Sequence, residues 1–103
     1  MAKDQTTTYP FSAPSLGENF FLSIRTSKSN GRLLSIATVA EKSGSFTTYR
    51  VYHDYYRIVI NGGNKRATQK AIDTQHQEAV EMLGTITADA LRHYAEIAAK
   101  EAA

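Results

Sequence analysis

The sequence predicts an α+β domain: an antiparallel meander of three to four strands, then a long C-terminal helix, continuous or broken, packed on the sheet. Apolar and polar residues alternate with a period of two between about residues 20 and 60. Turn signals divide that part at Asn30-Gly31 and at Ser43-Gly44. After residues 61–64, NGGN, the period changes to about 3.6, which is typical of an amphipathic helix.

The chain of 103 residues is long enough for one domain. We expect that domain to span residues 18–103, with the sheet at about 18–60 and the helical part at about 65–100. Residues 1–17 are polar and contain a threonine triplet and both prolines, so we expect a flexible N-terminal arm. Three apolar side chains are candidates to anchor this arm: Tyr9, Phe11 and Leu16.

The first two strands are predicted to form a hairpin around Asn30-Gly31, because both central positions of a type I′ turn need positive φ. In the first strand, one face carries Phe20, Leu22 and Ile24, and the other carries Phe21, Ser23 and Arg25. In the return strand, one face carries Leu34 and Ile36, and the other carries Leu33, Ala37 and Val39. This alternation predicts half-buried strands.

The next strand-like run covers residues 45–60, which is much longer than a usual strand of about 5–6 residues. We therefore expect the run to bend near His53-Asp54. The bend would divide it into strands at about 46–52 and 55–60.

The helical part presents one apolar face from about Arg66 to Ala99, and its phase continues through Gly84. One continuous helix of this length would be about 50 Å long. A strand of about eight residues spans only about 27 Å. Either the helix breaks at residues 84–87, or its overhanging part packs on a second copy of the chain.

Several functional classes are disfavoured by the sequence. The chain has no cysteine, which excludes disulfides, thiolate catalysis and cysteine-ligated zinc. It shows no signal peptide at residues 1–15 and no membrane span, so we expect a cytoplasmic protein. No Ser-His-Asp order or carboxylate pair stands out, and His76 is expected to be a half-exposed helix residue. We therefore expect a protein that is not an enzyme and uses no cofactor or metal.

Positive charge is concentrated in the first two thirds of the chain. Residues 1–66 carry nine Lys/Arg and four Asp/Glu, a net of +5, whereas residues 67–103 carry three and six, a net of −3. Four of the six tyrosines lie in residues 48–66, among several cations. Rings between cations on a sheet face suit single-stranded nucleic acid. The alternative is ordinary sheet packing, because aromatic residues favour strands in any case.

The segment 61–70, NGGNKRATQK, is a second candidate site. Free N–H groups and the dipole at a helix start favour an anion, and Lys65, Arg66 and Lys70 flank this start. The alternative is a plain strand-to-helix connection that needs the backbone freedom of glycine.

The order of elements over residues 18–83, a strand meander and then a helix with a basic aromatic sheet, resembles single-stranded nucleic-acid modules of the Whirly and PUR type. This resemblance implies a ββββα unit that works as a homodimer. It rests on the order of elements alone and assigns no role to any residue.

The sequence thus predicts a small non-enzymatic module that binds single-stranded DNA or RNA through a basic, tyrosine-rich sheet face. The residues expected to bind are Arg25, Arg50, Tyr52, Arg57, Lys65 and Arg66. The alternative is a protein-binding inhibitor or adaptor of the viral or plasmid type that docks on a larger host complex, because Tyr and Arg are also enriched at protein interfaces.

Overall fold

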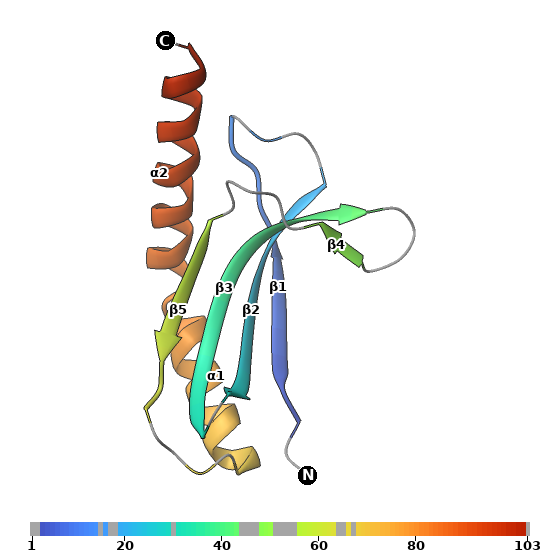
Figure 1. Ribbon diagram of the computed structural model, residues 1–103, viewed down its shortest axis with the longest axis vertical. Helices are drawn as coiled ribbons and strands as arrows, with labels where there is room; N and C mark the ends of the chain where they lie inside the picture. Colours follow the sequence, from blue (N-terminus) through green and yellow to red (C-terminus); the bar gives the residue numbers. More distant parts are fainter. Residues whose placement is uncertain are drawn as a thin grey trace.

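The protein is one antiparallel sheet of five described strands with two helices on one face, as seen in the computed structural model (Figure 1). The structure describes residues 3–14, 16, 19–29, 31–43, 48–50, 56–63, 66 and 68–102. These residues confirm the predicted α+β architecture, a meander followed by a C-terminal helical part packed on the sheet.

The first strand, β1 (Gln5–Pro10), corrects the interpretation of residues 1–17 as an arm. It pairs antiparallel with the next strand, from Gln5 opposite Thr26 to Pro10 opposite Phe21. Its polar composition suggested an arm, but threonine is β-branched and favours strands. Pro10 is tolerated because β1 lies at an edge of the sheet. The three expected anchors do pack on the core: Phe11 is buried, and Tyr9 and Leu16 are partly buried.

The strands β2 (Phe20–Ser29) and β3 (Arg32–Ser43) form the predicted hairpin. Ser29 lies opposite Arg32, and Gly31 has φ +77°, the left-handed conformation that the turn requires. The predicted alternation is confirmed. Leu22, Ile24, Leu33, Ala37 and Val39 are buried, whereas Leu34 and Ile36 on the other face are half-buried.

The strand β4 (Thr48–Arg50) lies within the predicted segment 46–52, and β5 (Arg57–Asn61) begins within the predicted segment 55–60 and ends one residue beyond it. Both pair with the same edge of β3, β4 opposite Glu41–Ser43 and β5 opposite Leu34–Thr38. Between these two sections β3 curves strongly (Figure 1). The bend expected at His53-Asp54 lies outside the described residues.

The helical part consists of α1 (Gln69–Glu81) and α2 (Leu83–Ala102). The helical part is divided, as in the first of the two alternatives, but the interruption is at Met82 and not at residues 84–87. The Met82 N–H donates to the carbonyl of Ala79, and the Ile86 N–H donates to the carbonyl of Met82. The last turn of α1 therefore tightens to a 3₁₀ bond before the helix resumes, which needs no glycine. Gly84 lies in the first turn of α2.

The apolar stripe continues across Met82, so both helices bury the same face against the sheet. Its buried members are Ile72, Ala79, Ile86, Ala90 and Tyr94. α2 runs past the end of β5 (Figure 1). The Tyr94 ring, near the end of this stripe, lies 5.9 Å from the Phe11 ring, and its hydroxyl accepts a hydrogen bond from the Tyr56 N–H at 3.1 Å. Residues that follow β1 therefore cover part of α2 within the chain itself.

A polar network lies inside the helix–sheet interface near α1. Thr26 Oγ1 lies 2.7 Å from Ser35 Oγ and 2.8 Å from His76 Nδ1, and His76 Nε2 lies 2.8 Å from Thr7 Oγ1. His76 is only 8% exposed, which corrects the expectation of a half-exposed residue. Burial lowers the pKa of His76, and the nearby Asp73 carboxylate opposes that shift. This network joins β1, β2, β3 and α1.

Candidate nucleic-acid interface

The face of the sheet turned away from the helices is the first candidate site, and we call it the open face. The pairing register places its side chains in rows across four strands, one residue from each strand. One row is Thr6, Arg25, Ile36 and Val59. The next is Thr8, Ser23, Thr38 and Arg57. The open face therefore combines two arginines with hydroxyl groups and a few apolar side chains.

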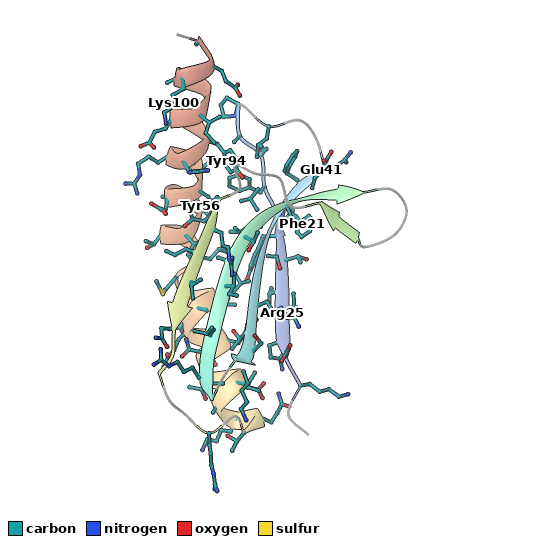
Figure 2. All side chains as sticks on the ribbon, in the orientation of Figure 1. Phe21, Arg25, Glu41, Tyr56, Tyr94 and Lys100 are labelled. Carbon is teal, nitrogen blue, oxygen red and sulfur yellow. The ribbon has the colours of Figure 1, made fainter. Side chains whose placement is uncertain are left out.

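Arg25 lies on β2, and its side chain is 62% exposed (Figure 2). Its Nη2 donates to Oδ2 of Asp4 at 2.7 Å. An exposed ion pair of this kind contributes only about 0–1 kcal/mol, so an incoming anion can replace the carboxylate at little cost. The sequence interpretation selected Arg25 but did not foresee Asp4 beside it, because the strand pairing that joins them was not predicted.

Arg57 begins β5 and is exposed on the open face, in the row next to that of Arg25. β3 separates their strands, so the two Cα atoms lie about 12 Å apart, given a strand spacing of about 4.8 Å and a rise of about 3.3 Å per residue. Val59, two residues along β5, is 48% exposed. Arg25 and Arg57 are thus both on one surface, as expected.

The structure describes the other four predicted site residues only in part. Arg66 is exposed just before α1, whereas Lys65 and Tyr52 lie outside the described residues. Arg50 lies opposite Glu41 in the β3–β4 pairing, and the structure describes only its backbone. Tyr56, from the same tyrosine-rich stretch, is only 5% exposed and belongs to the core. At least this tyrosine of the stretch serves packing.

The connection between β5 and α1 was predicted as an anion site, and that remains a prediction. Thr68 caps α1, and its Oγ1 accepts from the Ala71 N–H at 3.1 Å, so one free donor of the helix start is already used. Gly62 lies against Gln75, where an added Cβ would be 2.6 Å from Oε1. Close packing on α1 is therefore one reason for glycine in this loop.

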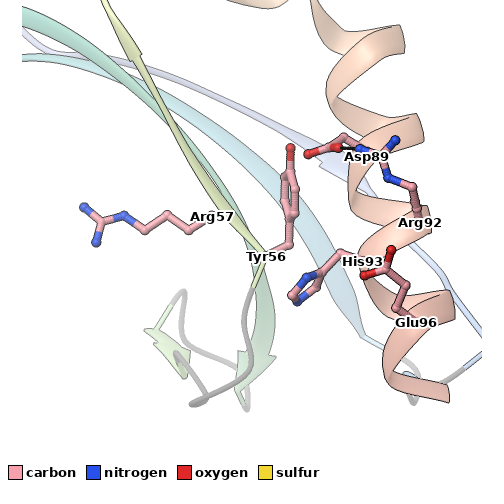
Figure 3. A pocket seen from close by; sticks show the side chains of 6 residues that line it. All are labelled: Tyr56, Arg57, Asp89, Arg92, His93 and Glu96. Carbon is pink, nitrogen blue, oxygen red and sulfur yellow. Dashed lines mark hydrogen bonds and ion pairs between the residues drawn. The ribbon is translucent and has the colours of Figure 1, made fainter. Parts of the chain in front are cut away.

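A second candidate site is an open polar cleft of about 600 Å³ between the start of β5 and one flank of α2 (Figure 3). The side chains that line it are Tyr56, Arg57, Asp89, Arg92, His93 and Glu96. Asp89 forms an ion pair with Arg92. Among the described residues, no group of three His, Asp or Glu side chains is arranged to hold a metal ion.

The Tyr56 ring closes the inner end of this cleft. Its centroid lies 5.9 Å from that of His93, whose ring lies 5.0 Å from that of Tyr94. The Tyr56 hydroxyl is buried and points towards Asp89 (Figure 3), but no hydrogen bond of normal geometry joins it to a described residue. Burial, together with the Asp89 carboxylate, raises the pKa of Tyr56. The phenol therefore stays neutral at ordinary pH and supplies no charge to the cleft.

The cleft mixes two arginines with two carboxylates, so it favours neither sign of charge, whereas the described cations of the open face outnumber its acids. No helix in the described part of the chain is long and apolar enough to cross a membrane. Comparison with protein-family models, with curated proteins and with solved structures gave no significant match.

Proposed function

We propose that the protein binds single-stranded nucleic acid on the open face, without enzymatic activity. The observation that carries this proposal is the position of Arg25 and Arg57 in adjacent rows of a sheet face that both helices leave uncovered. Guanidinium groups form bidentate hydrogen bonds with phosphate, which lysine cannot do.

The side chains between the two arginines suit the same ligand. Ser23 and Thr38 supply hydroxyl donors for phosphate and sugar oxygens. Phe21, which precedes Ser23 on the same face, is half-buried, so a base would stack on the exposed part of its ring, and stacking does not depend on base identity. A single strand exposes its bases to such contacts, whereas a duplex hides them. We therefore expect a preference for single strands with little sequence specificity.

The charge distribution also favours binding of a polyanion on the open face and not on the helix side. The described parts of α1 and α2 carry six Asp/Glu and three Lys/Arg, all on the opposite side of the sheet or at its margin. A polyanion would be repelled from the helices and attracted to the open face.

The test is fluorescence anisotropy of a labelled single-stranded oligonucleotide, with duplex DNA and single-stranded RNA in parallel, at several salt concentrations. Arg25→Ala combined with Arg57→Ala should weaken binding at least tenfold and reduce the salt slope by about 1.4, because each phosphate contact on a single strand contributes about 0.7. The matched control is Lys28→Ala combined with Lys100→Ala, which removes the same charge from exposed positions on the helix side of the sheet.

Equal losses in the two double variants would show that net charge alone drives binding and would contradict the assigned face. If the wild-type chain binds no nucleic acid even at low salt, the proposal is wrong. A protein-docking role on a larger complex, the second function expected from the sequence, would then be the one to pursue by affinity capture.

A further inference from the structure

The outer edge of β1 is the most unusual part of the surface that the proposed function does not use. β1 is the outermost strand on one side of the sheet, on the right in Figure 1, and among the described strands it pairs only with β2. Its sequence, QTTTYP, carries no charge. An uncharged edge strand rich in β-branched residues is a template for pairing with another strand.

The hydrogen-bond pattern shows which backbone groups of β1 are not used by β2. The Phe11 N–H donates to the carbonyl of Phe20 at 3.2 Å, in the same register as the rest of the β1–β2 ladder. In an antiparallel ladder, every second residue bonds to the neighbouring strand. Gln5, Thr7 and Tyr9 therefore bond to β2. The N–H and C=O groups of Thr6 and Thr8 point outward, away from β2.

These outward groups are complementary to themselves under a two-fold rotation. When two β1 strands pair antiparallel about Thr7, Thr6 of each copy faces Thr8 of the other. Each of these two pairs exchanges two backbone hydrogen bonds, and threonine side chains face each other on the open face. Asp4 then lies opposite Pro10 of the second copy, so no like charges meet. Pro10 lacks an N–H, but its carbonyl remains free to accept from Asp4.

The opposite edge, β5, is less suited to a second copy. The Val39 N–H bonds to the carbonyl of Tyr56 and the Gly62 N–H to the carbonyl of Leu33, so Arg57, Val59 and Asn61 direct their backbone groups outward. However, α2 lies alongside this edge and forms the cleft with Tyr56 (Figures 1 and 3). Arg57 also places a charge on the edge, which discourages strand addition.

We propose that the protein forms a symmetric homodimer by antiparallel pairing of β1 with β1 of a second copy, centred on Thr7. The two sheets become one, and the two open faces lie side by side on the same surface. The β1–β1 interface does not depend on nucleic-acid binding, so a result that contradicts the dimer would not contradict the proposed function, and the reverse also holds. It specifies where the dimer expected from the sequence would form.

The test measures molecular mass by sedimentation equilibrium over a wide concentration range. Thr6→Lys combined with Thr8→Lys places like charges opposite each other in the proposed register and should leave a monomer. Thr6→Glu combined with Thr8→Lys places opposite charges together in both pairs and should restore the dimer. Both residues are exposed on the open face, so neither variant disturbs the core, and circular dichroism checks this.

Each outcome decides the proposal. A wild-type chain that is monomeric at every concentration, or a double-lysine variant as dimeric as the wild type, would overturn it. A charge-paired variant that stays monomeric would overturn the register about Thr7. Amide hydrogen exchange gives an independent measurement in the unmodified chain: protection of the Thr6 and Thr8 amides should rise with concentration, whereas Thr7 and Tyr9 stay protected throughout.

Discussion

The two faces of the sheet are formed by the same strands, yet they differ in what they bury. The face that packs against the helices is the covered face, and on it Leu22, Ile24 and Val39 are fully or almost fully buried. On the open face, the neighbouring positions hold Ser23, Arg25 and half-buried Ile36. If the open face binds a ligand as proposed, alternation along a strand separates residues that stabilise the fold from residues that bind, so a substitution on one face should affect one property and spare the other.

The largest expected effect is a cavity on the covered face. Ile24→Ala should lower the free energy of unfolding by about 2–5 kcal/mol, because Ile24 is completely buried. The matched substitution on the open face, Ile36→Ala, should lower it by about 1 kcal/mol, since Ile36 is only half-buried. Urea denaturation measures both, and equal losses would show that something covers the open face.

A smaller effect is expected from the buried polar network. Thr26→Val keeps the shape but removes the hydroxyl that contacts both Ser35 and His76, so it should cost about 1–3 kcal/mol. Thr38→Val, on the open face, should stay within about 0.5 kcal/mol of the wild type. A Thr26→Val variant as stable as the wild type would contradict the network.

His76 makes the covered face sensitive to acid. Its pKa is lowered in the folded state by burial, so the unfolded chain binds more protons below about pH 6.5, the ordinary value. Stability from this group is complete above that pH and falls as the pH drops towards the folded-state value, by at most about 1.4 kcal/mol per pH unit.

The measurement is the pH dependence of the unfolding free energy in the wild type minus that in His76→Gln. The subtraction removes the contributions of other titrating groups, including Asp73, whose pKa is lowered by hydrogen bonds from Gln69 and Gln5. A difference that does not change between about pH 7.5 and pH 5.5 would contradict the assignment.

The smallest effect concerns the open face. Asp4 forms an ion pair with the Arg25 guanidinium, so Asp4→Asn should release the guanidinium for the ligand. We expect the free energy of nucleic-acid binding to become more favourable by about 0.2–1 kcal/mol, the usual contribution of an exposed ion pair. Glu78→Gln removes the same charge from an exposed position on α1 and is the control. Tightening by the control alone would contradict the role of Asp4.

The covered face could be predicted from the sequence because its signal is periodic. The hairpin at Asn30-Gly31, the division of residues 45–60 into two strands and the apolar stripe of the helices all follow from alternation, turn residues and a period of 3.6. β1 was missed because its residues alternate in burial but not in polarity: Gln5 and Thr7 are polar residues on the covered face.

Other features depend on contacts between distant residues, which no local sequence pattern predicts. His76 is buried because Thr7 and Thr26, from distant strands, supply partners for both ring nitrogens. Met82 itself is neither Gly nor Pro, and Gly84, which suggested a break, lies in the first turn of α2. In the candidate site, Arg25 was selected from strand phase and Arg57 from the interleaving of rings and cations, whereas the Arg25–Asp4 pair depends on the unpredicted β1–β2 pairing.

The central claim, that the open face binds single-stranded nucleic acid, is tested most directly by methyl NMR of a chain labelled at the isoleucine δ1 carbons. Ile36 is on the open face, whereas Ile24, Ile72 and Ile86 are buried on the covered side. Titration with a single-stranded oligonucleotide should shift the Ile36 signal and leave the buried three unchanged. Shifts confined to isoleucines of the helices, or no shift at a concentration where anisotropy reports binding, would contradict the claim.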